Sequence, residues 1–160
     1  LQRLDHPVVK VSWLDATAYA AWLARVTGLP WRLPTEAEWE WAARGEEGRL
    51  YPWGDQWDPA RANTSEGGKG GTTPVGAYAG RGDASPCGAH DMAGNEWEWT
   101  SSAWQQYPND DRRGSNQVDS TKNRVLRGGS WYFNARIARV AFRGSRGLGG
   151  FRLVCAVPSS

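Results

Sequence analysis

The sequence predicts one compact, loop-rich domain that contains both helices and strands. Two stretches in its first third carry helix-capping residues around apolar repeats, and its last third holds short strand-like stretches. Eleven Trp and twenty Gly residues accompany an ordinary apolar content. Large flat side chains joined by Gly-rich connections indicate a core built largely from indoles rather than from aliphatic layers.

The first predicted helix follows an extended stretch over residues 6–13. Ser12 or Asp15 can cap it, and we expect it to run to about Thr27, where Gly28 ends it. Four apolar residues recur on one face at helical spacing, namely Tyr19, Trp22, Leu23 and Val26.

The second predicted helix spans residues 34–44. Thr35 and Glu38 have capping-box spacing ahead of Trp39, and Gly45 ends the pattern.

Residues 46–89 show little periodicity, so an organiser is expected there: metal ions, or packed aromatic side chains such as Trp53, Trp57 and Tyr78. Aromatic alternation over residues 97–100 predicts a strand. Residues 125–126 and 151–157 are predicted to form the last strands, and Cys155 is expected to be a small core residue. The polar residues 105–123 are predicted to form an exposed loop.

Size and charge restrict the function classes. A chain of 160 residues suits one domain, and a net charge of +2 gives no reason to expect a nucleic-acid partner. No apolar run approaches the roughly 20 residues of a transmembrane helix, so we expect a soluble domain. The chain starts at Leu1 without a Met. Missing upstream sequence could hold a signal, and both a cytoplasmic location and surface display stay open.

Residues 132–149, here named the biased segment, have an unusual composition. They contain no Trp, Met, Lys, Glu or Gln, although these types make up roughly a fifth of the remaining chain. Every charged residue between Tyr132 and Arg152 is Arg. These arginines either pair with carboxylates such as Glu96 or Glu98, or form an anion-attracting face.

Five motifs in order resemble the formylglycine-generating-enzyme (sulfatase-modifying factor) domain: residues 32–40 (RLPTEAEWE), 51–54 (YPWG), 91–100 (DMAGNEWEWT), 127–131 (RGGSW) and 150–152 (GFR). They cover nearly the whole chain. The resemblance implies an α+β domain over residues 1–160 with a C-type lectin-like fold: two helices, small twisted antiparallel or mixed sheets and extensive irregular loops. The usual family domain begins some tens of residues earlier, with N-terminal strands that we expect to be missing from the sequence at hand.

The resemblance also indicates which residues the family's catalytic chemistry would require. The oxidase members bind copper through two cysteines, whose positions here hold Phe133 and Ala138. Neither side chain provides the thiolate that copper(I) requires, so we expect no copper and no catalytic residue. The related iron-dependent sulfoxide synthases use a His cluster of a separate domain. This chain has only His6, expected at the surface, and His90, expected in the core.

The composition of the biased segment resembles that of proteins diversified by retroelements. Replacement of adenines in Asn codons yields many residue types but never the five absent ones. The resemblance predicts ten varied, ligand-binding positions: Tyr132, Phe133, Asn134, Ile137, Phe142, Gly144, Ser145, Gly147, Leu148 and Gly149. It predicts six fixed positions between them, Ala135, Arg136, Ala138, Arg139, Ala141 and Arg143. Structural roles are expected for Arg127, Trp131, Arg139, Arg143 and Arg152.

In the family, the loop equivalent to residues 91–98 binds calcium. The resemblance implies four calcium ligands: a side-chain oxygen of Asp91, the carbonyls of Gly94 and Glu96, and the carboxylate of Glu98. Carboxylates and carbonyls on a tight loop suit this hard cation. The alternative is that Glu98 forms a salt bridge with an Arg and no metal binds. The family's other calcium loop, which starts at Asn63, is shortened and lacks Asp here.

The leading hypothesis is a non-enzymatic protein that binds an unknown protein or surface ligand through the biased segment. The first alternative is an enzyme or accessory domain of the sulfatase-modifying type, and the second is a carbohydrate-binding or sensor module.

Overall fold

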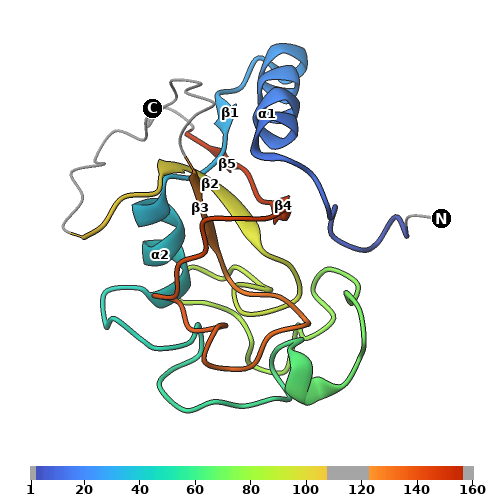
Figure 1. The fold of residues 1–160 in the computed structure, drawn as a ribbon, viewed down its shortest axis with the longest axis vertical. Helices are drawn as coiled ribbons and strands as arrows, with labels where there is room; N and C mark the ends of the chain where they lie inside the picture. Colours follow the sequence, from blue (N-terminus) through green and yellow to red (C-terminus); the bar gives the residue numbers. More distant parts are fainter. Residues whose placement is uncertain (1–2, 108–122, 157–160) are drawn as a thin grey trace.

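The computed structural model describes residues 3–107 and 123–156. Figure 1 shows helices α1 and α2 beside two small sheets, with long loops forming the opposite half of the molecule. The predicted α+β class is confirmed. Most of the predicted polar loop over residues 105–123 lies outside the described residues.

Helix α1 (Trp13–Thr27) forms where its caps predict it. Ser12 and Asp15 make a reciprocal capping box, and Gly28 ends the helix at φ 70° in the left-handed region that glycine tolerates best. The side packed in the core carries Trp13, Ala16 and Ala20. Three residues of the predicted apolar face remain about half exposed instead: Tyr19 (47%), Trp22 (46%) and Val26 (56%).

Helix α2 (Glu36–Arg44) also begins at its predicted capping box, between Thr35 and Glu38, and ends at Gly45. It buries Glu36, Trp39 and Ala43 against the rest of the domain.

The larger sheet has the order β3–β2–β4. Its central strand, β2 (Glu98–Ala103), is buried along its whole length. It pairs antiparallel with β3 (Arg124–Arg127) and parallel with β4 (Gly150–Phe151). This arrangement brings both ends of the region around the biased segment next to β2, because β3 precedes the segment and β4 follows it.

The smaller sheet pairs β1 (Trp31–Arg32) antiparallel with β5 (Val154–Cys155). The prediction of a buried strand around Cys155 is only partly right, because both residues of β5 are half-buried. Among the described strands, β5 has a partner on one side only, namely β1.

The core consists of small clusters, as expected from the high Trp content. Trp13 and Trp99 belong to one cluster with Leu126, and Trp39 belongs to another with Val140. A single 3-10 turn, η1 (Ser65–Gly67), interrupts the long irregular region.

The expected aromatic organisers lie in that irregular region. The ring centroids of Tyr51 and Trp57 lie 5.0 Å apart, and Trp53 stacks on Tyr51 at 5.6 Å. Tyr78 is buried, with the Arg81 guanidinium over its ring. Within the described residues, no helix is long and apolar enough to cross a membrane.

Candidate functional site: a binding surface

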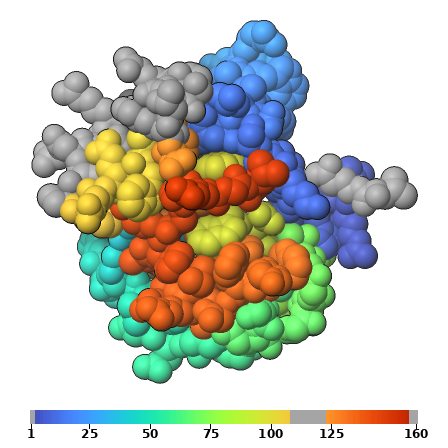
Figure 2. Space-filling model, viewed as in Figure 1, coloured from blue at the N-terminus to red at the C-terminus, as the bar shows by residue number. Residues whose placement is uncertain are grey.

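The biased segment crosses one face of the molecule (Figure 2, orange) and follows a series of tight turns. The Ile137 N–H donates to the Asn134 carbonyl at 3.0 Å, and the Phe142 N–H donates to the Arg139 carbonyl at 2.9 Å. In these turns main-chain N–H groups donate to main-chain carbonyls, so the side chains remain available for other contacts.

A continuous row of aromatic rings lies along this face. Ring centroids are 5.7 Å apart between Trp131 and Tyr132, and 5.7 Å apart between Tyr132 and Phe133. Phe133 lies 5.8 Å from Trp97, which lies 6.1 Å from Phe142. The exposed fraction is 70% for Tyr132 and 39% for Phe133, so much of this row faces solvent.

The ten positions predicted to vary differ in exposure. Five are exposed, namely Tyr132, Phe133, Asn134, Gly147 and Leu148. Four are half-buried, namely Ile137, Phe142, Gly144 and Ser145. Gly149 is buried.

Gly149 and Gly144 are restricted by their neighbours, contrary to the expectation of freely replaceable positions. A Cβ atom on Gly149 would lie 2.7 Å from the Trp97 carbonyl oxygen and 3.0 Å from a Leu126 methyl. A Cβ on Gly144 would lie 3.2 Å from the Trp97 ring, and Gly144 exchanges two main-chain hydrogen bonds with Leu126. The surface available for replacement therefore covers fewer positions than the sequence predicts.

The six positions predicted to be fixed differ in exposure. Ala138 is a core residue (1% exposed), as is the neighbouring Val140 (0%), so burial restricts replacement there. Ala135, Arg139 and Arg143 are half-buried. Arg136 and Ala141 are exposed, so burial does not explain them.

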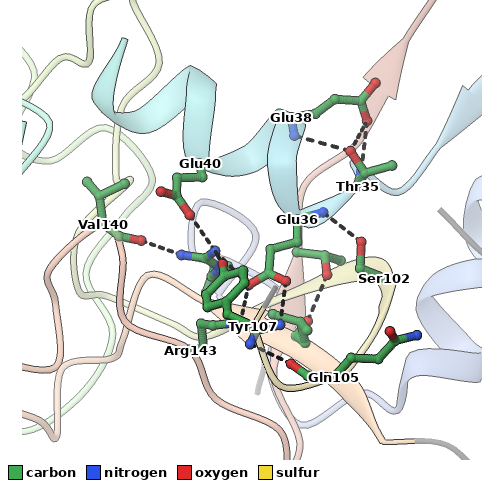
Figure 3. A network of polar contacts seen from close by, with 12 residues as sticks. Thr35, Glu36, Glu38, Glu40, Ser102, Gln105, Tyr107, Val140 and Arg143 are labelled. Atoms are coloured by element: carbon green, nitrogen blue, oxygen red, sulfur yellow. Dashed lines mark hydrogen bonds and ion pairs between the residues drawn. The ribbon is translucent and has the colours of Figure 1, made fainter. Parts of the chain in front are cut away.

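A network of ion pairs ties the second half of the segment to α2 (Figure 3). Arg143 Nε and Nη2 donate to the two carboxylate oxygens of Glu36 at 2.5 and 2.7 Å. Arg143 also donates to the Gln105 carbonyl at 2.7 Å and lies over the ring of Tyr107. The expected structural role of Arg143 thus has a geometric basis.

Arg127, at the end of β3, joins the same network from inside the molecule. Its side chain is fully buried and contacts both Glu36 and Glu40 at 2.6 Å. It also donates to the Val140 carbonyl at 2.6 Å, which fixes the main chain of the segment. A buried guanidinium between two carboxylates leaves none of the three charges unpaired.

Trp131 and Arg139 are less firmly held. The main-chain N–H of Trp131 donates to the Asn95 carbonyl at 3.1 Å, and the residue is half-buried. Arg139 donates from Nε to the Arg136 carbonyl at 3.1 Å, which closes a local turn.

A main-chain clamp that the sequence analysis missed holds the first half of the segment. The Ser65 N–H donates to the Phe133 carbonyl at 3.0 Å, and Glu66 accepts from the Ala135 N–H at 2.8 Å. Both residues belong to η1, nearly 70 positions away. No local pattern in the sequence indicates so distant a contact.

The two positions that the resemblance predicts to correspond to copper ligands lie in different surroundings. Ala138 is buried beside Ala62 and Ala93, with Trp53 and Trp57 packed around this cluster. Phe133 lies on the surface against the Trp97 ring.

Two carboxylates of the loop of residues 91–98 accept hydrogen bonds from protein donors. Both carboxylate oxygens of Glu98 accept from Arg152, at 2.5 and 2.6 Å, and one also accepts from the Trp39 indole N–H at 2.6 Å. Asp91 accepts the Gly76 N–H at 2.7 Å. Among the described residues, no group of three or more His, Cys, Asp or Glu side chains is placed to hold a metal. These contacts match the alternative of a Glu98–Arg salt bridge.

Burial dominates the electrostatics of this loop. Burial, together with a smaller contribution from the nearby charge of Glu98, raises the pKa of the Glu96 carboxyl to about 7. Burial also raises the pKa of Asp91.

The two histidines are placed differently from the predictions. His6, expected at the surface, has a side chain that is only 9% exposed and bonds Thr72 through Nδ1. His90, expected in the core, is 40% exposed and bonds the buried carboxylate of Asp83 at 2.9 Å.

Comparison with known protein families matches residues 1–157 to the "Sulfatase-modifying factor enzyme 1-like domain". The chain belongs to this family. The "Inactive C-alpha-formylglycine-generating enzyme 2" of Bos taurus is 41% identical over 141 residues, which cover 81% of this chain and 40% of that protein. The "Formylglycine-generating enzyme" of Bos taurus is 39% identical over 146 residues, 82% of this chain and 36% of that protein. The chain therefore spans about two fifths of the length of these relatives.

Solved structures share the fold. PvdO from Pseudomonas aeruginosa superposes with a TM-score of 0.83 at 29% identity, covering 98% of this chain and 64% of that one. "Treponema denticola variable protein 1" superposes with a TM-score of 0.78 at 24% identity, covering 94% of this chain and 71% of that one. The second likeness establishes a shared fold.

Proposed function

We propose that this member of the family is a non-enzymatic binding protein, and that a retroelement has diversified the exposed part of its biased segment. The observation that carries the proposal is the alternation of anchored and exposed residues. Ala138, Val140 and Arg143 hold the path, whereas Tyr132, Phe133 and Leu148 point to solvent. Exposed replacements cost about 0.5 kcal/mol or less, so such a surface tolerates new side chains.

The loss of the copper ligands supports a role without catalysis. Ala138 and Phe133 offer no thiolate. Of the two cysteines, Cys87 contacts the Ala42 carbonyl and Cys155 lies in β5. The family contains both proteins named as enzymes and proteins named as inactive, so membership alone does not assign activity.

The fold shared with a variable protein supports the diversified role. Diversification would also explain why five residue types are absent from the biased segment, because adenine replacement in Asn codons does not produce codons for them.

The shape of the surface favours a macromolecular partner. Four cavities of the described residues are lined by residues outside 132–149. The aromatic row, by contrast, is an open surface with a half-exposed apolar edge. Aromatic residues and Arg are the types that contribute most to protein–protein interfaces, and Arg136 and Arg146 are exposed on this segment.

Genome sequence provides the decisive test of diversification. We expect a reverse transcriptase gene nearby and a near-copy of the DNA for residues 124–152 in which Asn codons replace the varied positions. A complete genome without such a copy would refute diversification.

Binding is tested by displaying a library in which only Tyr132, Phe133, Asn134, Ile137 and Leu148 vary. We expect most members to fold and some to bind unrelated protein baits. A second library that varies Gly149, Val140 and Ala138 is the control, and we expect most of its members not to fold. Equal folding in both libraries would contradict the assignment of exposed and anchored positions.

The enzyme and lectin alternatives make different predictions. An oxidase would consume oxygen in the presence of copper and a Cys-containing sulfatase peptide, and we expect no consumption. A calcium-dependent lectin would bind a glycan array and lose that binding on chelation of calcium.

A further inference from the structure

We propose that the guanidinium of Arg152 replaces calcium as the cation of the loop formed by residues 91–98. The inference concerns the scaffold and holds whether or not the proposed function is right. It starts from a disagreement: the resemblance implies calcium ligands at Asp91 and Glu98, whereas the structure pairs these residues with protein donors.

Arg152 saturates the carboxylate of Glu98. Nε donates to one oxygen at 2.5 Å and Nη2 donates to the other at 2.6 Å. The side chains are only 28% and 11% exposed. A two-point pair of this kind is the strongest carboxylate contact that Arg makes, because its planar fork matches both oxygens.

The same guanidinium closes the loop. Arg152 Nη2 lies 3.1 Å from the His90 carbonyl and 3.4 Å from the Asp91 carbonyl, at the start of the loop, while Glu98 stands at its end. One positive group therefore joins both ends of the loop, which is the role that a bound calcium ion would have.

Two of the other three groups named for calcium also have partners. The Gly94 carbonyl accepts the Glu96 N–H at 2.9 Å, and the Asp91 carboxylate accepts the Gly76 N–H at 2.7 Å. Calcium requires six to eight oxygen ligands, and a permanent positive charge beside the same carboxylate opposes its entry.

The loop also supports the candidate surface. Trp97 lies between Glu96 and Glu98, and its ring contacts both Phe133 and Phe142. An Arg-closed loop therefore holds the base of the aromatic row at any calcium concentration.

The test compares the thermal unfolding of the wild-type protein in millimolar calcium and in EDTA. We expect the same midpoint to within about 1 °C, since a ligand that does not bind the folded state cannot stabilise it. Terbium, whose luminescence nearby Trp residues would sensitise, should give no saturable signal that calcium competes away. A calcium-dependent rise in the midpoint, or a competed terbium signal, overturns the proposal.

Two variants sharpen the test. Arg152→Gln removes the charge, and we expect its midpoint to fall by about 6 °C or more and to recover partly in calcium, because Glu98 is released. Arg152→Lys keeps the charge and should show no response to calcium. If calcium stabilises neither Arg152→Gln nor the wild type, the guanidinium does not occupy a cation position and the proposal fails. If Arg152→Gln does not fold, the wild-type measurements still decide.

Discussion

Arg143 and Glu36, 107 positions apart in the chain, form a two-point ion pair that fastens the biased segment to the first turn of α2. Glu36 is 4% exposed and also contacts Arg127. The carboxylate is thus shared between an arginine of the scaffold and an arginine of the segment.

Replacing Arg143 by Ala should therefore destabilise the whole domain. Removing one partner of a buried pair costs about 3–5 kcal/mol, and because Arg127 still compensates Glu36 we expect about 2–4 kcal/mol. Thermal unfolding should show a midpoint lower by roughly 5–15 °C. Arg146→Ala, at an exposed position of the same segment, is the control and should change stability by less than about 0.5 kcal/mol. Equal losses in both variants would contradict the anchoring role of Arg143.

Two positions that the sequence predicts to vary, at opposite ends of the segment, should respond very differently to the same new side chain. Tyr132→Ser affects a side chain that is 70% exposed and should cost about 0.5 kcal/mol or less. Gly149→Ser places a Cβ 2.7 Å from the Trp97 carbonyl and should cost at least about 2 kcal/mol. Urea unfolding of the two variants measures both values, and a Gly149→Ser protein as stable as Tyr132→Ser would show that the backbone adapts easily.

The sequence predicts those features of this domain that depend on local chemistry. Helix α2 begins at the capping box read from a four-residue pattern, α1 begins at Ser12, one of its two predicted caps, and both end at the predicted glycines. The Glu98–Arg152 pair was also one of the open alternatives, because both residues lie in recognisable motifs.

Features that depend on the tertiary path were not predictable in the same way. Pairing of the segment's arginines with carboxylates was one of two open alternatives. The partner of Arg143 is Glu36 on α2, and no spacing in the chain indicates that contact. The side of α1 that faces the core carries Ala16 and Ala20, since small residues allow close approach, and the larger Trp22 stays half exposed. The restriction at Gly149 is likewise set by Trp97 and Leu126, which lie beside it only after folding.

Glu38 predicts a stability change at acid pH. Hydrogen bonds from Arg32, with those from Thr35, lower the pKa of its carboxyl from 4.5 to about 2. A lowered folded-state pKa gives a contribution that is complete above about pH 5 and is lost as the pH falls toward 2. Glu38→Gln should therefore cost about 1 kcal/mol near pH 7, a value reduced by the partial exposure of the pair, and almost nothing near pH 2. Urea unfolding over this range tests it, with Glu46→Gln as the exposed control, and a constant difference between wild type and Glu38→Gln would contradict it.

Glu66 should control the order of the first half of the segment. Its carboxylate accepts the Ala135 N–H at 2.8 Å, and because that contact is with the main chain it does not depend on which side chains the segment carries. In Glu66→Ala we expect the Ala135 amide to exchange its hydrogen roughly five- to tenfold faster, as for the loss of one hydrogen bond near the surface. Glu66→Gln keeps an acceptor oxygen and should show a smaller change. Glu47→Ala removes an exposed carboxylate that contacts only Arg49 among the described residues, and should leave this amide unchanged. Unchanged exchange in Glu66→Ala would mean that the turns of the segment alone hold its path.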